Sequence, residues 1–293
     1  MALQIRPLHP LFAAEIAGVD LAAELDDATI GAISDAAARH AVLVFRGQRL
    51  TNDGQVAFAR RFGEPEISTA VHRAGQKLRL RPEMADVSNL DPDGKARGRD
   101  DRQRMFALGN QLWHTDSSFR RVPGALSMLH AHGAPPPEGG ETEFTDLRAA
   151  WDELPEAMKR KVEGLVAEHS LMHSRATLGF ADFSPEEHAA LPPVRQPVVR
   201  LHAGSGRKTL YLASHASHII GWPVPDGRML LRELIEFATQ ARFVHRHHWQ
   251  LGDLVIWDNR CTMHRGRPYD DSLPRDLRRV TTSDVGPALE QVA

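Results

Sequence analysis

The chain has 293 residues, of which 42% are hydrophobic and 25% are charged, a composition typical of a globular protein. Its formal net charge is −2, which argues against nucleic acid or an anionic membrane surface as a partner and favours a small molecule. Cys261 is the only cysteine, so a disulfide within the chain is excluded.

No segment approaches the roughly 18 continuous apolar residues of a membrane helix. The first residues also lack the apolar region of a secretory signal. We therefore expect a cytoplasmic protein with no membrane contact. The length permits one large domain or two small ones, and we expect one domain over residues 1–293. The chain has no internal repeat and no low-complexity tract.

The first part of the chain predicts helices, a buried strand and a long loop. A helix is expected over residues 28–39, where Ile30, Ile33 and Ala37 share one face. The continuously apolar residues 41–45 predict a buried strand, and a second helix is expected over residues 53–61. Residues 66–110 are mostly polar and aperiodic, with a strand-like stretch only at 85–88. This region is expected to be a loop or lid.

The remainder of the chain predicts many short strands. Apolar runs bounded by Gly and Pro occur at residues 125–129, 141–144, 198–201, 209–212, 243–249, 254–257 and 277–282. Helices are expected between them, at residues 147–154, 156–164 and 226–239. Seven short strands are typical of a sandwich or barrel. The expected fold is therefore mainly β with flanking helices.

Two histidines and an aspartate form a candidate metal site. On an extended segment His114 and Asp116 point the same way, because side chains alternate with period two. This triplet is a weak signal alone, but His264 follows the predicted buried strand 254–257, where a rigid third ligand is expected. Three protein ligands on one face of an octahedral ion leave three positions open, as non-heme Fe(II) oxygenases need to bind an oxidisable co-substrate and O2. The predicted chemistry is oxidation at iron.

Polar side chains near these ligands are candidates for binding substrates. Arg275 and Arg279 follow His264, and an arginine fork binds a carboxylate through two parallel charge-assisted bonds. Ser117 directly follows Asp116 and is a candidate substrate contact, although a serine there is as often a backbone hydrogen-bonding residue. The alternative for the arginines is an exposed, charged strand.

Several long sequence blocks resemble one family of enzymes. The blocks cover residues 9–14, 42–48, 110–119, 202–208 and 252–261, in order along nearly the whole chain. They are similar to the taurine dioxygenase family of Fe(II)- and 2-oxoglutarate-dependent dioxygenases, and especially to its 2,4-dichlorophenoxyacetate (aryloxyalkanoate) branch. Thr115 stands where close relatives are expected to have serine, another small residue.

The resemblance implies a fold and a set of roles. The fold would be a double-stranded β-helix, the cupin-like jelly roll, and relatives tend to form homo-oligomers. His114, Asp116 and His264 would be the catalytic iron ligands. Thr142 and Arg275 would bind the distal carboxylate of the co-substrate 2-oxoglutarate, and Arg279 would take the acidic group of the primary substrate.

The resemblance also bears on the substrate pocket. His202, His215 and His218 lie in shared blocks, and from these we expect His202 and His218 to bind substrate. A basic residue of the loop 66–80 is expected to meet the substrate carboxylate, with His72, Arg73 and Lys77 as candidates.

The implied reaction is hydroxylation of the carbon beside the ether oxygen of an aryloxyacetate such as 2,4-dichlorophenoxyacetate. The products would be a phenol, glyoxylate, succinate and CO2. The nearest alternative is a dioxygenase for taurine, another alkylsulfonate or an alkyl sulfate ester. A zinc-dependent hydrolase also suits a His/Asp/His set, but it explains neither Thr142 nor Arg275. A non-catalytic binding protein would require a broken ligand triad.

Overall fold

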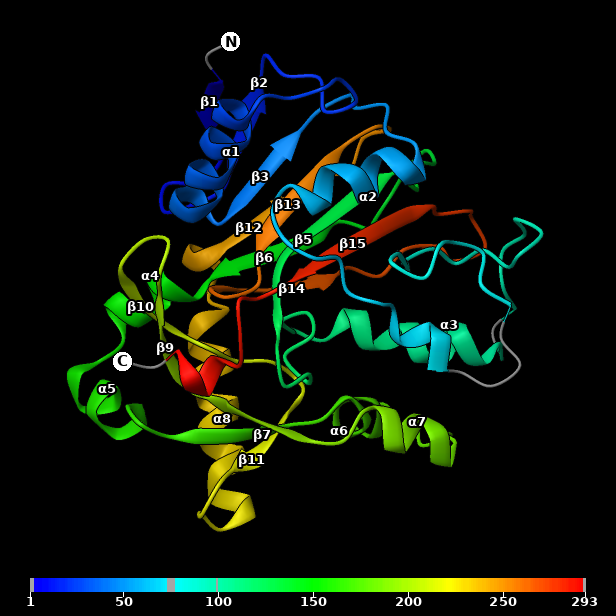
Figure 1. Ribbon diagram of the computed structural model, residues 1–293. Coiled ribbons are helices and arrows are strands. Elements are labelled where there is room, and N and C mark those ends of the chain that lie inside the picture. The colour runs from blue at the N-terminus through cyan, green and yellow to red at the C-terminus, as the bar shows by residue number, and fades with distance from the viewer. Residues whose placement is uncertain (1–2, 73–76, 99, 292–293) are drawn as a thin grey trace.

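The larger of two facing sheets has seven strands. The computed structural model describes residues 3–72, 77–98 and 100–291 (Figure 1). Neighbours in this seven-stranded sheet are antiparallel except for β2 and β3. In spatial order the strands are β1 (Gln4–Pro7), β2 (Ala14–Ala17), β3 (Val42–Phe45), β13 (Leu254–Asp258), β5 (Gly124–Ala131), β15 (Leu277–Ser283) and β4 (Ala85–Asp86).

A three-stranded sheet packs against one face of the larger sheet. It consists of β12 (Val244–His247), β6 (Thr142–Asp146) and β14 (Thr262–Gly266), in that order. The apolar core between the two sheets contains Val42 and Val44 of β3, Trp257 of β13 and Phe144 of β6. Because side chains alternate along a strand, Leu43 and Phe45 point to the opposite face, so β3 is buried on both sides.

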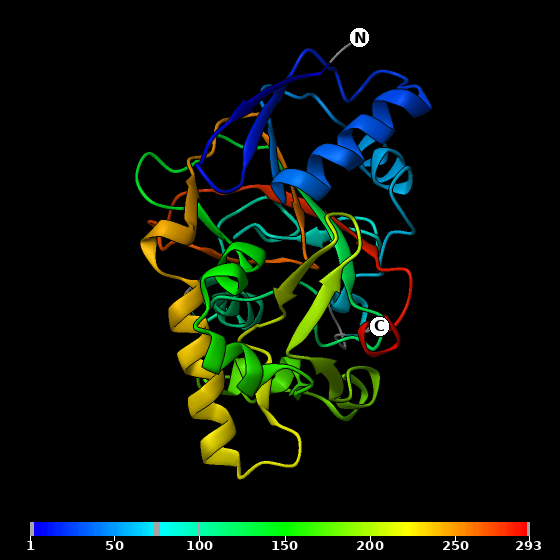
Figure 2. The ribbon, with the colours of Figure 1, turned by 90° about the vertical axis from the view of Figure 1, so that its left-hand side faces the viewer.

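Helices α1 (Asp27–His40) and α2 (Asn52–Arg60) cover that opposite face (Figures 1 and 2). Asp26 caps α1 by accepting a hydrogen bond from Thr29 N at 2.8 Å, and Thr51 caps α2 in the same way. The predicted stripe of Ile30, Ile33 and Ala37 is buried. Both predicted helices are confirmed to within two residues.

A second apolar core lies at the other end of the molecule, around α8 (Val224–Ala238). The segments that build this end are α4 (Leu147–Glu153), α5 (Glu156–Val162), β7 (Val166–His169), α6 (Leu171–Ala176), α7 (Pro185–Ala190), β8 (Val194–Pro197), β9 (Val199–His202), β10 (Arg207–Leu210) and β11 (Ala216–Ile219). Among the described residues, no helix is long and apolar enough to cross a membrane.

Residues 66–110 contain more regular structure than the sequence predicts. Besides β4, this region holds α3 (Arg102–Ala107) and two 3-10 helices, η1 (Thr69–His72) and η2 (Leu108–Gln111). Distant groups hold α3 in place, because Arg102 forms ion pairs with Asp182 and Glu187. The prediction of a simple loop was wrong here, since a six-residue helix has no periodic pattern and its partners lie far along the chain.

The contact between α8 and β11 gives a stability prediction. A Cβ atom at Gly227 would lie 2.8 Å from Ile219 N, whereas one at Gly31 would meet nothing within 4 Å. We expect Gly227→Ala to destabilise the protein by about 1–3 kcal/mol through overpacking. The matched Gly31→Ala should stabilise by about 0.5–1 kcal/mol, because alanine loses less backbone entropy in a helix. Urea unfolding measures both, and equal effects would contradict the tight contact.

Candidate active site

The three predicted metal ligands come together in the structure. His114 and His264 pair through their backbones, with His114 N donating to His264 O at 3.0 Å and His264 N to His114 O at 2.8 Å. Asp116 lies two residues after His114, and one ligand atom from each of the three residues falls within 4.8 Å of the others. All three side chains are buried. The site is thus built where the segment before Asp116 extends the smaller sheet.

Both imidazoles turn the same nitrogen toward the aspartate. His114 Nδ1 lies 2.7 Å from Leu112 O, which requires a proton on Nδ1 and leaves Nε2 with a free lone pair. His114 Nε2 lies 3.8 Å from Asp116 Oδ1, and His264 Nε2 lies 3.9 Å from Asp116 Oδ2. Trp257 and Phe144 pack against the His264 ring. The donors therefore converge on one point backed by the core.

Neighbouring side chains hold the Asp116 carboxylate in place. Ser127 Oγ donates to Asp116 Oδ2 at 2.7 Å, and Arg279 Nη1 donates to Oδ1 at 2.5 Å. The side-chain oxygen of Asn259 accepts a hydrogen bond from the backbone N–H of Asp116, and its side-chain Nδ2 donates one to Ser127 Oγ. Hydrogen bonds of this kind orient ligands around a metal.

The protonation states suit metal binding. Burial lowers the pKa of His114 to about 4 and places the pKa of His264 well below its ordinary value. Burial alone would raise the pKa of Asp116, but Arg279 and the two imidazoles outweigh it, so the pKa lies below the ordinary value. At neutral pH the site offers two neutral imidazoles and one carboxylate, a donor set that fits Fe(II) with positions left open.

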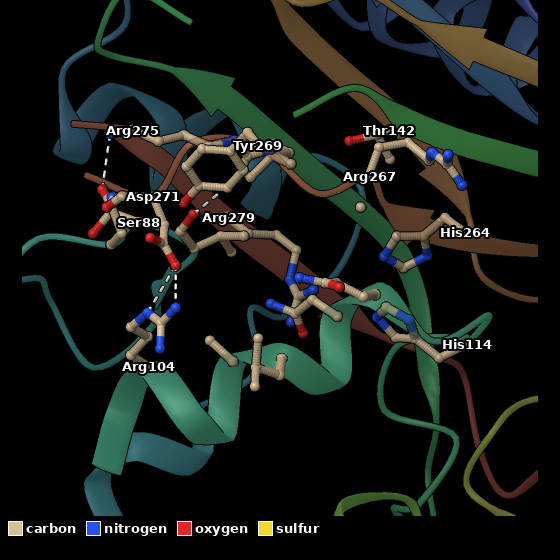
Figure 3. Close-up of a pocket in the computed structure, with 18 of the residues that line it drawn as sticks. Ser88, Arg104, His114, Thr142, His264, Arg267, Tyr269, Asp271, Arg275 and Arg279 are labelled. Carbon is tan, nitrogen blue, oxygen red and sulfur yellow. Dashed lines mark hydrogen bonds and ion pairs between the residues drawn. The ribbon is translucent and has the colours of Figure 1, made fainter. Parts of the chain in front are cut away.

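One cavity beside the ligands is built for an anion; we call it the co-substrate cavity (Figure 3). Arg275 lines it at 9% exposure, and its guanidinium donates only to carbonyl oxygens, those of Val87 at 3.3 Å and Gly140 at 3.2 Å. No carboxylate of the described residues pairs with it, and burial lowers its pKa. Thr142 accepts a hydrogen bond from Trp249 and keeps its own hydroxyl proton to donate. An anion in this cavity would satisfy the buried charge.

A second cavity, the primary cavity, opens on the other side of the ligands. His114 and Arg279 line both cavities, so the two meet at the metal ligands. The aromatic rings of Phe106 and Phe119 and the aliphatic chain of Leu171 line the primary cavity. It therefore combines an apolar wall with polar side chains, among them Arg279 beside the ligands.

Ser117 lines the primary cavity, but its hydroxyl has a protein partner. Its Oγ donates to Glu66 Oε2 at 2.5 Å, and its φ of 56° is a left-handed conformation. Burial raises the pKa of Glu66 to about 7 in spite of the nearby Arg120. This contact fixes the turn that follows Asp116, so we assign the Ser117 hydroxyl a positioning role rather than a substrate contact.

Two other predicted substrate residues lie away from the site. His202 is buried between Asp258, at 3.0 Å, and Ser205, at 2.7 Å. His218 lies on β11 beside Glu168. Neither lines the co-substrate or the primary cavity. We therefore do not assign either histidine to substrate binding. A block of sequence shared with a family indicates relatedness, but it does not show which way a side chain points.

Two of the three loop candidates for the substrate carboxylate are not supported. His72 ends η1, and neither His72 nor Lys77 lines the primary cavity. Arg73 lies outside the described residues. The sequence reasoning missed Arg175 of α6 and left His215 unassigned, and both line the primary cavity. The sequence offers only a weak indication of either residue: each follows a short apolar stretch, at residues 171–172 and 210–213. The tertiary fold brings the two side chains together.

A buried centre of two histidines and a carboxylate, beside a cavity with an uncompensated arginine, defines a non-heme Fe(II) dioxygenase that uses 2-oxoglutarate. The chain belongs to the TauD, TfdA family, described as taurine catabolism dioxygenases, whose model matches residues 4–281. The family prediction from the sequence is confirmed.

Individual relatives are dioxygenases that resemble the chain over nearly its whole length. The chain is 50% identical over 285 residues to the alpha-ketoglutarate-dependent 2,4-dichlorophenoxyacetate dioxygenase of Cupriavidus pinatubonensis, covering 97% of this chain and 99% of that one. It is 38% identical to the (S)-phenoxypropionate/alpha-ketoglutarate-dioxygenase of Sphingobium herbicidovorans, over 92% and 91% of the two chains. The crystal structure of AAD-2 with Mn(II) and N-oxalylglycine matches with a TM-score of 0.91 at 46% identity, over 98% and 100%.

Ser127 gives a prediction for metal affinity. Ser127→Ala removes the hydrogen bond to Asp116 Oδ2, so we expect roughly 10–100-fold weaker binding of Fe(II) or Mn(II). Isothermal titration under anaerobic conditions measures the affinity. Ser205→Ala is the control, because Ser205 bonds His202 away from the centre. Equal affinities in the two variants would show that Ser127 does not support the ligand.

Buried histidines give a prediction for stability against pH. Burial lowers the pKa of His169 to about 3, whereas in the unfolded chain a histidine titrates near 6.5. Between these values the unfolded state binds the extra proton, so stability falls as the pH falls. The free energy of unfolding should drop by about 2 kcal/mol for this residue alone between pH 7 and pH 5. His169→Asn should make the measured drop smaller, and an unchanged drop would contradict the assignment.

Proposed function

We propose that the enzyme oxidises an aryloxyacetate such as 2,4-dichlorophenoxyacetate at the carbon between the ether oxygen and the carboxylate. The observation that carries this proposal is the primary cavity, where Arg279 lies beside Asp116 and aromatic side chains form the further walls. An anionic group near the metal and an aromatic ring away from it match these walls. The 50% identity to a 2,4-dichlorophenoxyacetate dioxygenase supports the same class of substrate.

The overall reaction balances. The aryloxyacetate, 2-oxoglutarate and O2 give a phenol, glyoxylate, succinate and CO2, because the hydroxylated carbon forms a hemiacetal that collapses to the phenol and the aldehyde. Iron held by the three ligands would supply the activation of O2. The protein's own contribution is to hold the reacting carbon close to that centre in one orientation.

Each cavity residue has a proposed task. Arg275 and Thr142 hold the distal carboxylate of 2-oxoglutarate, since one offers a buried charge and the other a hydroxyl proton. Arg279 pairs with the carboxylate of the primary substrate, and its contact with Asp116 keeps that charge next to the reacting carbon. The apolar walls exclude water from the ring.

We also propose that the two facing sheets form a double-stranded β-helix and that the chain works as a single domain. Support comes from the shared core between the sheets and from the match to the family over residues 4–281. A cytoplasmic location would suit ferrous iron and the single cysteine.

Succinate formation tests the proposal. The protein is purified anaerobically, loaded with Fe(II), 2-oxoglutarate and ascorbate, and exposed to air with phenoxyacetates, taurine or an alkyl sulfate ester. We expect phenoxyacetates to stimulate succinate formation with an equal amount of phenol. Stimulation by taurine or the sulfate ester alone would move the substrate to that class. Oxygen-independent turnover would instead indicate a hydrolase.

Arg275 gives a separate prediction. Arg275→Met removes a buried guanidinium that no carboxylate of the described residues pairs with, so the KM for 2-oxoglutarate should rise roughly ten- to hundredfold. The KM for the primary substrate should change little. Arg278→Met is the control, because Arg278 pairs with Asp276 and lines neither cavity. A higher KM for the primary substrate alone would reverse the assignment of the two cavities.

A further inference from the structure

The primary cavity has a polar end that the acid group of an aryloxyacetate does not use. Arg279 reaches the cavity from β15, whereas Arg175 and His215 reach it from α6 and from the segment before β11. Their charge environments differ accordingly. Arg279 forms an ion pair with Asp116, whereas Arg175 donates a hydrogen bond to Ser174, which also contacts His215. The two arginines therefore serve different parts of a bound molecule.

One serine fixes both groups at this polar end. Ser174 Oγ donates its single proton to Leu171 O at 2.8 Å. It must then act as the acceptor for Arg175 Nη1, at 3.1 Å, and for His215 Nδ1, at 2.8 Å. This assignment places the imidazole proton on Nδ1, because a hydroxyl has only one proton to give. His215 thus keeps an acceptor lone pair on Nε2.

The guanidinium beside this imidazole is rigidly placed. Arg175 is 5% exposed, and its Cζ lies 4.5 Å from the centre of the Phe106 ring. A Cβ atom at Gly109 would come within 2.1 Å of the same Cζ, so the backbone there packs directly against the guanidinium. Its N–H groups are donors only. A fixed donor and a fixed acceptor therefore lie next to each other, both held by Ser174.

We propose that Arg175 and His215 bind a hydroxyl group on the aromatic ring of the primary substrate. The hydroxyl oxygen accepts from the Arg175 guanidinium, and the hydroxyl proton is donated to His215 Nε2. The proposal rests on the proposed function, since it takes the acid group to lie at Arg279 and the ring to extend away from it. The preferred substrates are then aryloxyacetates with a hydroxylated ring.

Halogen, methoxy, carboxylate and ammonium substituents satisfy at most one of the two partners. A halogen or a methoxy group has no proton for His215 Nε2. A second carboxylate would meet the guanidinium well but would face the Nε2 lone pair. An ammonium group would be repelled by Arg175. Buried polar groups that lose their partners weaken binding, so a hydroxyl is the substituent that suits this pair.

Matched substrates test the preference. Succinate formation is compared for 3- and 4-hydroxyphenoxyacetate, for the fluoro analogues of similar size and for the methoxy analogues, which only accept. We expect kcat/KM for the better hydroxy compound to exceed that of its fluoro analogue by about tenfold, the value of one well-made hydrogen bond. The methoxy compound should stay near the fluoro one.

Two variants test the proposal, one by changing His215 and the other by displacing Arg175. His215→Asn keeps a donor for Ser174 but removes the Nε2 acceptor, and Gly109→Ala displaces the Arg175 guanidinium without replacing it. In both, the ratio of kcat/KM between hydroxy and fluoro compounds should fall toward one. His173→Asn on α6 is the control and should keep the wild-type ratio, because His173 does not line the cavity. Thermal unfolding of each variant shows whether it is folded.

Binding without turnover gives an independent readout. Dissociation constants of the hydroxy and fluoro compounds are measured with Mn(II) and N-oxalylglycine present, and they should differ by the same factor. Equal values for both compounds in the wild type, or a preference that survives in His215→Asn and Gly109→Ala, would overturn the proposal. If no phenoxyacetate stimulates succinate formation, the proposed function fails, and the binding constants still decide whether this end prefers a hydroxyl.

Discussion

The active site depends on the backbone pairing between His114 and His264. Two hydrogen bonds, of 3.0 and 2.8 Å, join segments that lie far apart in the chain. Residues directly opposite each other in an antiparallel pair carry their side chains on the same face at close range, and the centres of these two imidazole rings are 4.2 Å apart. Asp116 follows His114 after one intervening residue, and its carboxylate lies beside both rings.

The centre is also an extension of the core between the two sheets. His264 lies opposite Phe144 in the register of β14 and β6, and Trp257 of β13 contacts the same imidazole. Core packing of this kind restricts the rotamers of the ligand. The hydrogen bonds of Ser127 and Asn259 restrict the carboxylate in turn. The core side chains that pack against His264 thus help to define the metal position as well as to stabilise the fold.

Local sequence patterns predicted the elements that are long or buried on both faces. Examples are α1 and α8, which have helical periodicity, and β3, which is a continuous apolar run. In these elements the local pattern and the tertiary packing favour the same structure. The short strand β14 was not predicted, so His264 was expected after a strand and not within one. Strands such as β1 are exposed along their whole length and leave no apolar signal.

The residues of the site fall into the same two groups, those that local patterns indicate and those that only tertiary contacts place. The metal ligands and the cavity position of Arg275 could be predicted because motif spacing and family resemblance identify them. Which histidine faces the primary cavity depends on tertiary contacts, so His202 and His218 were chosen wrongly and His215 was left unassigned. Arg175 carries no motif at all. Its place depends on the close approach of Gly109 from another segment, which no local pattern encodes.

Because Arg279 lines both cavities, its charge is shared by whatever occupies them. An anion in one cavity changes the field that an anion in the other experiences, so the affinities for the two substrates are coupled. Linkage requires this coupling to be reciprocal: the factor by which the first substrate alters the affinity for the second equals the factor in the opposite direction. One side chain thereby couples the two affinities by the same factor, whichever substrate binds first.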